Sequence, residues 1–261
     1  MHVWQIATVL FLAYVAAAAV WPGRRRPRRL VHLYAGVVIG VLFTAVMAAL
    51  PSRPLLHDWV APPVVLLLGY WVSGLLFVAP DPEQERVLLD FDRRLDVAGI
   101  AARMPHPIAA VLEMAYAGVY PLIPLALILR VIYFADADPA RFWSVILITD
   151  FICFALLPWV QTRPPRSIEG IDPWQSVARR FNLGLLGTAS IQVNTFPSGH
   201  AAEALACALL VLGAPWPVFV CMLLAALAVS AGAVFGRYHY AADAISGWLV
   251  AVVVWMVRGV I

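Results

Sequence analysis

Long apolar runs alternate with short polar connections along the whole chain. Eight runs approach the length of a bilayer-spanning helix, roughly 17–25 residues, and they cover residues 3–21, 30–50, 60–80, 108–134, 143–161, 200–214, 217–236 and 240–260. This pattern predicts an all-α fold, a polytopic membrane helix bundle of about eight transmembrane helices. We expect residues 1–261 to form a single integral-membrane domain.

Two segments depart from a simple span. Residues 81–106 are rich in charge, and their apolar side chains recur at helical spacing, at Leu88, Phe91, Leu95 and Ala98. This spacing predicts an amphipathic helix in the membrane interface, serving either as a brace or as an entrance for lipid. The run at 108–134 contains Pro121 and Pro124, which we expect to kink it or to split it into a hairpin.

The composition agrees with a membrane protein. Hydrophobic residues make up 63% of the chain and charged residues 13%, against about 45–50% and about 25% in soluble domains. The net charge of +3 is too small to indicate nucleic-acid binding. All eighteen basic residues are Arg, so any cationic site must be built from guanidinium groups. Cys153, Cys207 and Cys221 lack metal or disulfide spacing, and we expect them to be buried apolar side chains.

The Arg residues are unevenly divided between the two faces of an eight-helix bundle. Fourteen of the eighteen fall in connections that share one face, at 22–29, 81–107, 162–199 and 237–239. The positive-inside rule places that face in the cytoplasm. A re-entrant hairpin at 108–134 would reverse this assignment. We expect the membrane to be the inner membrane of a bacterium.

His239 and Asp243 stand four residues apart at the start of the last apolar run. On a helix this spacing brings both side chains to one face, where the carboxylate can orient the imidazole and leave its other nitrogen free to attack or to take a proton. Alone, the pattern also fits an interfacial His beside an unrelated helix-capping Asp.

Ser198, Gly199 and His200 follow Pro197 at the start of another run. Free N–H groups at a helix start favour an anion, Ser198 adds a hydroxyl donor, and Gly199 lets the backbone approach closely. His200 can give a proton to a leaving group, and Glu203, one turn on, could orient it. The alternative is an ordinary Ser N-cap followed by a surface His.

Arg163 and Arg166 flank two prolines. Two guanidinium groups on a stiff loop suit a tetrahedral oxyanion, although an ordinary positive-inside loop would look the same. Together the three clusters predict a phosphoryl-transfer site with a nucleophile, a proton donor and an anion clamp. No dense set of metal ligands stands near them, which favours chemistry without a metal or another cofactor. Asp150 and Glu113 lie inside predicted spans, and we expect them to form structural ion pairs with Arg130 or with an active-site Arg, a proton relay being the alternative.

These clusters resemble the signature of the type 2 phosphatidic acid phosphatase (PAP2) superfamily, KxxxxxxRP, PSGH and SRxxxxxHxxxD. Residues 197–200 match PSGH, His239 and Asp243 match HxxxD, and Arg163-Pro164 matches RP. The resemblance covers about residues 143–260. It implies that residues 60–261 form a PAP2-like catalytic core of six helices and that residues 1–60 are additional N-terminal helices.

Two positions depart from the signature. The expected Lys is Leu156, and the expected Ser-Arg is Gly232-Ala233. RPPR together with RYHYxxD is similar to the branch that contains the inositol-phosphorylceramide-synthase-like enzymes. On this resemblance, Arg166 and Arg237 are expected to replace the missing Lys and Arg.

The resemblance also implies the role of each residue. His239 would attack phosphorus and form a phosphohistidine, Asp243 would orient it, and His200 would protonate the departing alcohol. The phosphoryl oxygens would be bound by Arg163, Arg166, Arg237, Ser198 and Gly199.

The activity implied by the resemblance is that of a membrane lipid phosphatase, a phosphoric monoester hydrolase acting on a phosphorylated lipid or polyprenyl (di)phosphate. One alternative is a lipid phosphotransferase that passes the phosphoryl group or phospho-headgroup to an acceptor alcohol. The other is a non-catalytic transporter or binding protein for anionic lipids. The expected partners are the phosphorylated lipid and the bilayer, and the lipid's identity and the oligomeric state stay open.

Overall fold

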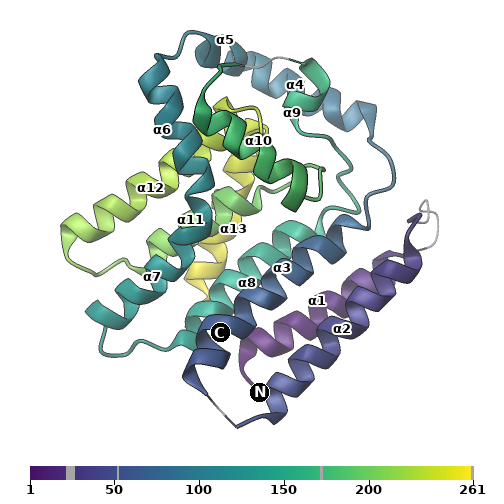
Figure 1. The fold of residues 1–261 in the computed structure, drawn as a ribbon, viewed down its shortest axis with the longest axis vertical. Helices are drawn as coiled ribbons and strands as arrows, with labels where there is room; N and C mark the ends of the chain where they lie inside the picture. The colour runs from purple at the N-terminus through teal and green to yellow at the C-terminus, as the bar shows by residue number, and fades with distance from the viewer. Residues whose placement is uncertain (22–26, 52, 171–172, 260–261) are drawn as a thin grey trace.

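The computed structural model describes residues 1–21, 27–51, 53–170 and 173–259. These residues form thirteen α-helices and one π-helix, and none of them lies in a strand (Figure 1). The predicted all-helical fold is therefore confirmed. The arginines at 24–26, which contribute to the predicted orientation, lie outside the described residues.

Each of the eight apolar runs is helical. They form α1 (Val3–Ala18), α2 (Leu30–Ala49), the π-helix η1 (Leu55–Val60) continuing into α3 (Ala61–Gly74), α6 (His106–Ala117) with α7 (Val119–Tyr133), α8 (Pro139–Ala155), α11 (Gly199–Leu210), α12 (Trp216–Phe235) and α13 (Ala241–Met256). Among the described helices, three segments are long and apolar enough to cross a membrane, namely α2, η1 with α3, and α12, and the α6–α7 pair would be a fourth. Helices α1, α11 and α13 are apolar but shorter.

The helix in the run at 108–134 is broken, as its prolines predict. The break lies a few residues before the two prolines in the sequence. Helices α6 and α7 meet at Gly118 with a bend of 65°. Pro121 then falls in the first turn of α7, where a missing backbone N–H costs no helical hydrogen bond. Pro124 is tolerated inside the helix.

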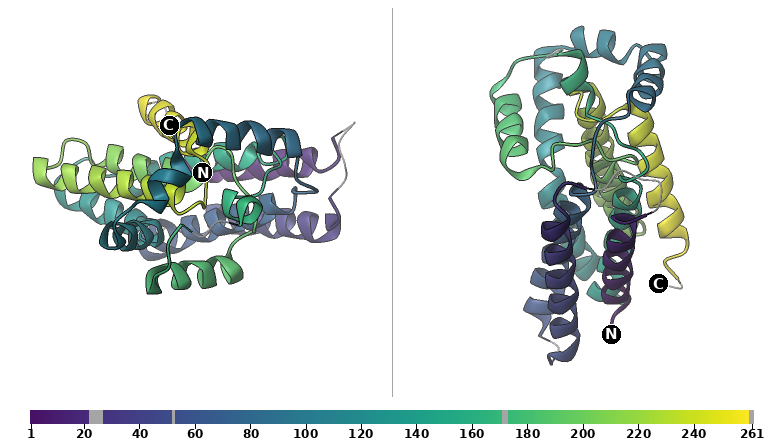
Figure 2. Two further views of the ribbon diagram at one scale, coloured as in Figure 1. Left: turned by 90° about the horizontal axis from the view of Figure 1, so that it is seen from above. Right: turned by 90° about the vertical axis from the view of Figure 1, so that its right-hand side faces the viewer.

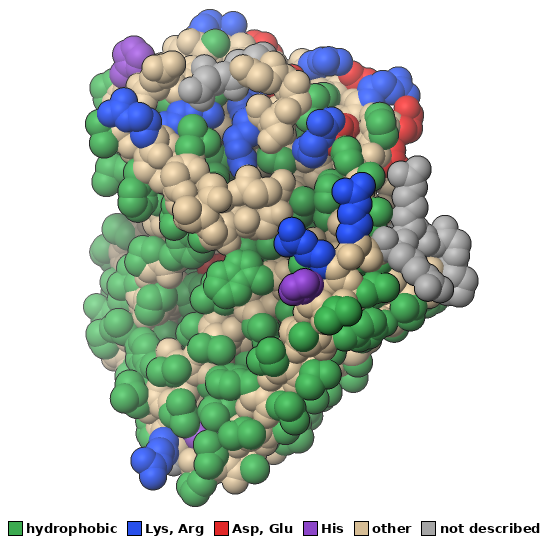
Figure 3. Space-filling model, turned by 45° about the vertical axis from the view of Figure 1, so that its right-hand side comes forward, with side chains coloured by type: hydrophobic (Ala, Val, Ile, Leu, Met, Phe, Trp, Pro, Cys, Tyr) green, Lys and Arg blue, Asp and Glu red, His purple; other side chains and the backbone are tan. Residues whose placement is uncertain are grey.

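Four shorter helices lie outside the apolar runs. They are α4 (Pro82–Arg94), α5 (Val97–Ala102), α9 (Pro165–Glu169) and α10 (Val177–Ala189). Helices α4, α5 and α9 cover one end of the bundle, and α10 lies on its flank (Figures 1 and 2). Charged side chains gather at this end, whereas the flank seen in Figure 3 is mostly apolar.

Helix α4 is the amphipathic helix that the charge pattern predicts, but its buried face is not the apolar one. Glu85, Leu89 and Asp92 are buried, whereas Phe91 and Leu95 are 36% and 46% exposed. The two carboxylates turn inward because each meets an arginine of the bundle, Glu85 with Arg163 and Asp92 with Arg237. The apolar stripe is left facing outward, as suits a helix at a membrane interface.

Helix α11 lies at the centre of the bundle and packs against α7, α8, α12 and α13. Its buried face is built from small residues, which let neighbouring backbones approach, and Ala201, Ala202, Ala204, Ala206 and Ala208 are fully buried. Gly247 of α13 is required here, since a Cβ at this position would come within 2.5 Å of the Ser198 carbonyl oxygen. This contact joins the starts of α11 and α13.

The cysteines follow the prediction with one exception. Cys153 and Cys207 are buried in the core, whereas Cys221 is exposed. Cys221 lies on α12, the most apolar of the long helices, so its side chain belongs to the outward apolar surface of the bundle.

Candidate active site

The loop between α12 and α13 presents His239. Arg237 takes a positive φ of 59°, and the backbone N–H groups of Tyr238 and His239 both donate to the Ala233 carbonyl. This tight turn ends α12 and places His239 two residues before α13 begins. The side chain is almost fully buried at 6% exposure, but it lines a pocket.

Asp243 lies beside His239, as the HxxxD spacing predicts. The His239 Nδ1 atom is 3.4 Å from Asp243 Oδ2, and the same oxygen accepts a 2.8 Å hydrogen bond from the Tyr240 backbone N–H. Asp243 is fully buried, so its orientation is restrained. The imidazole is held through Nδ1, and Nε2 has no hydrogen-bond partner among the described residues.

His239 is held in its neutral form. Burial, together with the positive charge of Arg166, lowers the pKa of His239 from its ordinary value of 6.5 to about 3. A neutral imidazole keeps a lone pair available at physiological pH, which is the form that a nucleophile needs.

His200 faces His239 from the first turn of α11. The two ring centroids are 5.9 Å apart, with the rings inclined by 49°. Tyr116 stacks on His200 with ring centroids 5.1 Å apart, and Tyr120 packs against it in a T-shaped arrangement at 5.9 Å. These rings fix the imidazole, while its buried Nε2 atom has no hydrogen-bond partner in the part of the chain that the structure describes.

Ser198 and Gly199 lie at the start of α11 but not in the pocket lining. The Ser198 hydroxyl caps the helix by accepting from the Ala201 backbone N–H at 3.3 Å, and the Ser198 N–H donates to the Asp243 carbonyl at 2.9 Å. The serine therefore ties the PSGH segment to the HxxxD segment. Its predicted contact with a phosphoryl group stays a prediction.

Among the predicted arginines, Arg166 reaches the pocket. It comes from the short helix α9, and its guanidinium carbon lies 5.1 Å from the centroid of the Tyr238 ring. Its backbone N–H donates to the Arg237 carbonyl, which fixes α9 against the catalytic loop. No carboxylate within the described ranges forms an ion pair with it.

Arg163 and Arg237 are instead paired with carboxylates. Arg163 donates from Nε and Nη2 to the two oxygens of Glu85, at 2.9 and 2.8 Å. Burial alone would raise the pKa of Glu85, but the hydrogen bonds from the Arg163 side chain and backbone lower it below its ordinary value. Arg237 is fully buried and donates to Asp92 and Glu169, each at 2.6 Å. Neither arginine lines the pocket.

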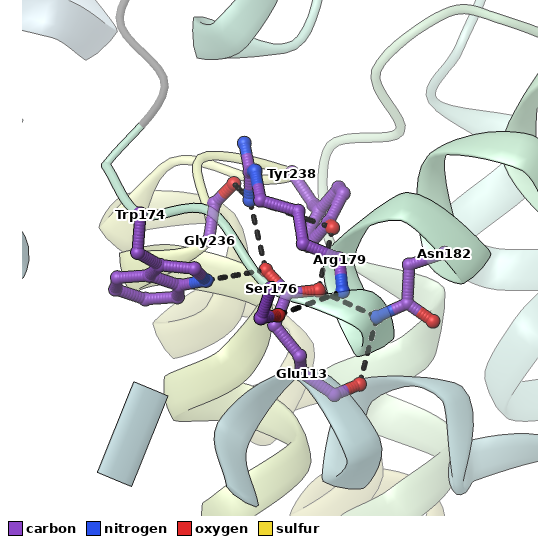
Figure 4. A network of polar contacts seen from close by, with 7 residues as sticks. All are labelled: Glu113, Trp174, Ser176, Arg179, Asn182, Gly236 and Tyr238. Atoms are coloured by element: carbon purple, nitrogen blue, oxygen red, sulfur yellow. Dashed lines mark hydrogen bonds and ion pairs between the residues drawn. The ribbon is translucent and has the colours of Figure 1, made fainter. Parts of the chain in front are cut away.

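A buried network behind Tyr238 was not expected from the sequence (Figure 4). Glu113 of α6 accepts from Tyr238 Oη at 2.7 Å and from Arg179 Nη1 at 2.8 Å. Trp174 and Asn182 also donate to this carboxylate. Glu113 therefore forms the ion pair that we expected, but with Arg179 of α10. A sequence signal existed in the spacing of Arg179 and Asn182, which puts both on one face of α10.

Asp150 and Glu203 form a different pair from the predicted ones. Their carboxyl groups hydrogen-bond to each other between α8 and α11. Among the described residues, Asp150 forms no ion pair with an arginine, and Glu203 forms no hydrogen bond with His200. A carboxylate has no donor of its own, so a carboxyl–carboxyl hydrogen bond requires a proton on one of the two.

The pocket brings these parts together. Its wall contains His200, His239, Arg166, Tyr116 and Tyr238. The described lining is completed by Tyr70, Pro164, Leu186, Ser190, Val193 and Thr195. Its cavity volume is about 20 Å³, enough for about one water molecule. Within the described part of the chain, no three His, Cys, Asp or Glu side chains converge as a metal site would need.

The pocket is lined by two histidines, one of them held by the buried Asp243, and by Arg166, which has no carboxylate partner among the described residues. These are the parts of a phosphoryl-transfer site. No curated protein and no solved structure gives a significant match to the chain. A family model described as PAP2 superfamily matches residues 84–257, which include Arg166, His200, His239 and Asp243. The chain therefore belongs to the PAP2 superfamily.

Proposed function

We propose that the chain is a membrane lipid phosphatase that acts on a phosphorylated lipid or polyprenyl (di)phosphate through a phosphohistidine. Membership of the superfamily supports phosphatase or phosphotransferase activity on lipid-like substrates. The observation that carries the proposal is the facing pair His239 and His200, with Arg166 on the same pocket.

The proposed reaction has two steps. His239 Nε2 attacks phosphorus, the bond from phosphorus to the alcohol oxygen breaks, and His200 gives that oxygen a proton. Then His200 takes a proton from water, the oxygen of this water attacks phosphorus, and the bond from phosphorus to His239 breaks to release phosphate. Asp243 holds the His239 ring through Nδ1 in both steps.

The proposed anion ligand is Arg166, in place of the family's missing lysine. Its guanidinium lines the pocket and has no competing carboxylate among the described residues. Binding by Arg163 and Arg237 stays a prediction, and it would require each to exchange a carboxylate for the substrate. The similarity to inositol-phosphorylceramide-synthase-like enzymes rests on the RPPR and RYHYxxD segments.

Transfer to an acceptor alcohol is the second candidate. The connection between α9 and α11 supplies one wall of the pocket through Leu186, Ser190, Val193 and Thr195, which could shape an acceptor site. Phosphate release measured with and without a candidate alcohol separates the two activities, because a transferase yields a phosphorylated acceptor instead of free phosphate.

The test is phosphate release from a panel of phosphorylated lipids by the purified full chain, with a chelator present. His239→Ala and His200→Ala are expected to lose at least about 10³-fold in turnover, since each removes a reacting group. The matched control is His32→Ala, an exposed histidine on α2. Full activity of His239→Ala contradicts the proposal, and absence of turnover with every lipid favours a non-catalytic lipid-binding protein.

We further propose that all eight apolar runs cross a bacterial inner membrane, with the active-site end in the cytoplasm. The support is the gathering of arginines on α4 and α9 at that end, on α10 at the adjoining flank, and at Arg103 directly after α5. Residues 60–261 would be the catalytic core. Consistent with that division, no described residue before Tyr70 lines the pocket.

A further inference from the structure

A second cavity lies at the end of the bundle opposite the active site. It has a volume of about 480 Å³ and lies where α7 and α13 end and α8 begins. These helix ends are in the lower half of Figure 1. This size is within the range of small-ligand sites, about 300–1,000 Å³. Among the described residues it shares none of its lining with the active-site pocket.

Three arginines from separate helix ends line this cavity. They are Arg130 of α7, Arg141 of α8 and Arg258, which follows α13. Arg141 and Arg258 lie close enough to Arg130 for their charges to repel it. Gathering three cations around one cavity is unfavourable unless an anion balances them.

The described lining holds two carboxylates, Asp136 and Asp138, against three arginines, which leaves an excess of one positive charge. Asp138 caps α8, accepting from the Ala140 backbone N–H at 2.9 Å. Asp136 is 3.5 Å from Arg130 Nη2, and its side chain is 82% exposed, so this pair contributes little. Arg141 has no hydrogen-bond or ion-pair partner within the described residues.

Two of the three guanidinium groups are held in place before any ligand arrives. Arg130 stacks 4.0 Å over the Phe134 ring, and one of its nitrogens is 3.4 Å from the Leu210 carbonyl. Arg258 stacks 3.8 Å over the Trp255 ring and donates to the Trp255 carbonyl at 2.7 Å. Each contact uses only part of a group with five N–H donors.

We propose that this cavity binds a phosphate-bearing anion, with the guanidinium groups of Arg130, Arg141 and Arg258 around its oxygens. Planar guanidinium groups match phosphate geometry, and basic pockets between transmembrane helices suit anionic headgroups. The rest of the lining includes Leu209, Leu212 and Met256, an apolar wall that fits the glycerol and acyl part of a lipid. The site is therefore separate from the catalytic pocket and lies toward the other leaflet.

The experiment is native mass spectrometry of the full chain in detergent, on a His239→Ala background that prevents turnover. Short-chain phosphatidylglycerol, short-chain phosphatidylcholine and inorganic phosphate are titrated separately. Arg141→Gln is the principal variant, because Arg141 makes no described contact that folding would lose. Arg53→Gln is the matched control, since Arg53 lies toward the same end outside the cavity lining.

We expect phosphatidylglycerol to bind more tightly than phosphatidylcholine. Arg141→Gln should weaken it about tenfold, as loss of one charged hydrogen bond implies, and Arg53→Gln less than twofold. Competition by inorganic phosphate would identify the free anion as a sufficient ligand, and binding of the lipid without competition would identify the headgroup in its lipid. Equal binding of the two lipids, or equal binding by Arg141→Gln and the control, would overturn the proposal.

Discussion

Both ends of the helix bundle carry arginines, and the two groups differ in their partners. At the active-site end, Arg163, Arg237 and Arg179 each form an ion pair with a buried or half-buried carboxylate. At the opposite end, three arginines line one cavity, and within the described ranges the ion pair that they form with a carboxylate is the weak, exposed contact of Arg130 with Asp136.

The difference separates two uses of the same side chain. A guanidinium paired with a carboxylate is neutralised and joins elements, as Arg237 joins the catalytic loop to α4 and α9. A guanidinium without such a partner is available to an external anion. At the active-site end most of the arginines named above are paired with carboxylates, but Arg166 has no such partner among the described residues. We therefore assign the binding of the phosphoryl group to Arg166.

Arg237→Gln tests the paired kind and should have the largest effect on stability. It leaves Asp92 and Glu169 without their cation, and loss of one partner of a buried pair typically costs about 3–5 kcal/mol. The free energy of unfolding in detergent measures this cost. Adding Asp92→Asn should recover part of it, and strictly additive losses would show that the two side chains do not interact.

Arg166→Gln tests the unpaired kind. It removes one positive donor from the pocket, and kcat/KM for a lipid phosphate should fall about 10²–10³-fold with little change in the unfolding free energy. If the variant instead lost stability and kept its turnover, Arg166 would have a structural role like that of the arginines paired with carboxylates.

The pH dependence of the same variant sharpens the assignment. Burial and the charge of Arg166 hold the pKa of His239 at about 3, below the ordinary 6.5. Removing the charge raises this pKa, so the imidazole protonates sooner as the pH falls, and the acid limb of kcat/KM moves to higher pH. Arg163→Gln is the control, since Arg163 does not act on His239. If the acid limb of kcat/KM lay at the same pH in both variants, the charge of Arg166 would not control the pKa of His239.

Labelling of Gly170→Cys on a Cys221→Ser background assigns the two ends to their sides of the membrane. Gly170 has open space around a Cβ, although its φ of 62° costs any other residue about 1 kcal/mol. We expect an impermeant thiol reagent to label it in lysed but not in intact cells. Labelling in intact cells would place the active site outside.

The motif residues show how far local spacing reaches. The i, i+4 spacing of His239 and Asp243 predicts their contact because the two residues are only four positions apart in the sequence. The facing of His200 and His239 is not local, and for it the resemblance to a family was needed. Glu85 and Asp92 could not be assigned from spacing, because their partners are far along the chain.

The sequence alone determined the membrane character, the eight apolar helical runs and the residues that carry chemistry. Apolar run length and residue type are properties of the chain itself. Only the tertiary structure decided which arginines meet carboxylates, that Asp150 meets Glu203, and that α4 turns its acidic face inward. In an interior that excludes water, the position of each charge depends on the partner that packing brings to it, and such partners are set by contacts between distant segments.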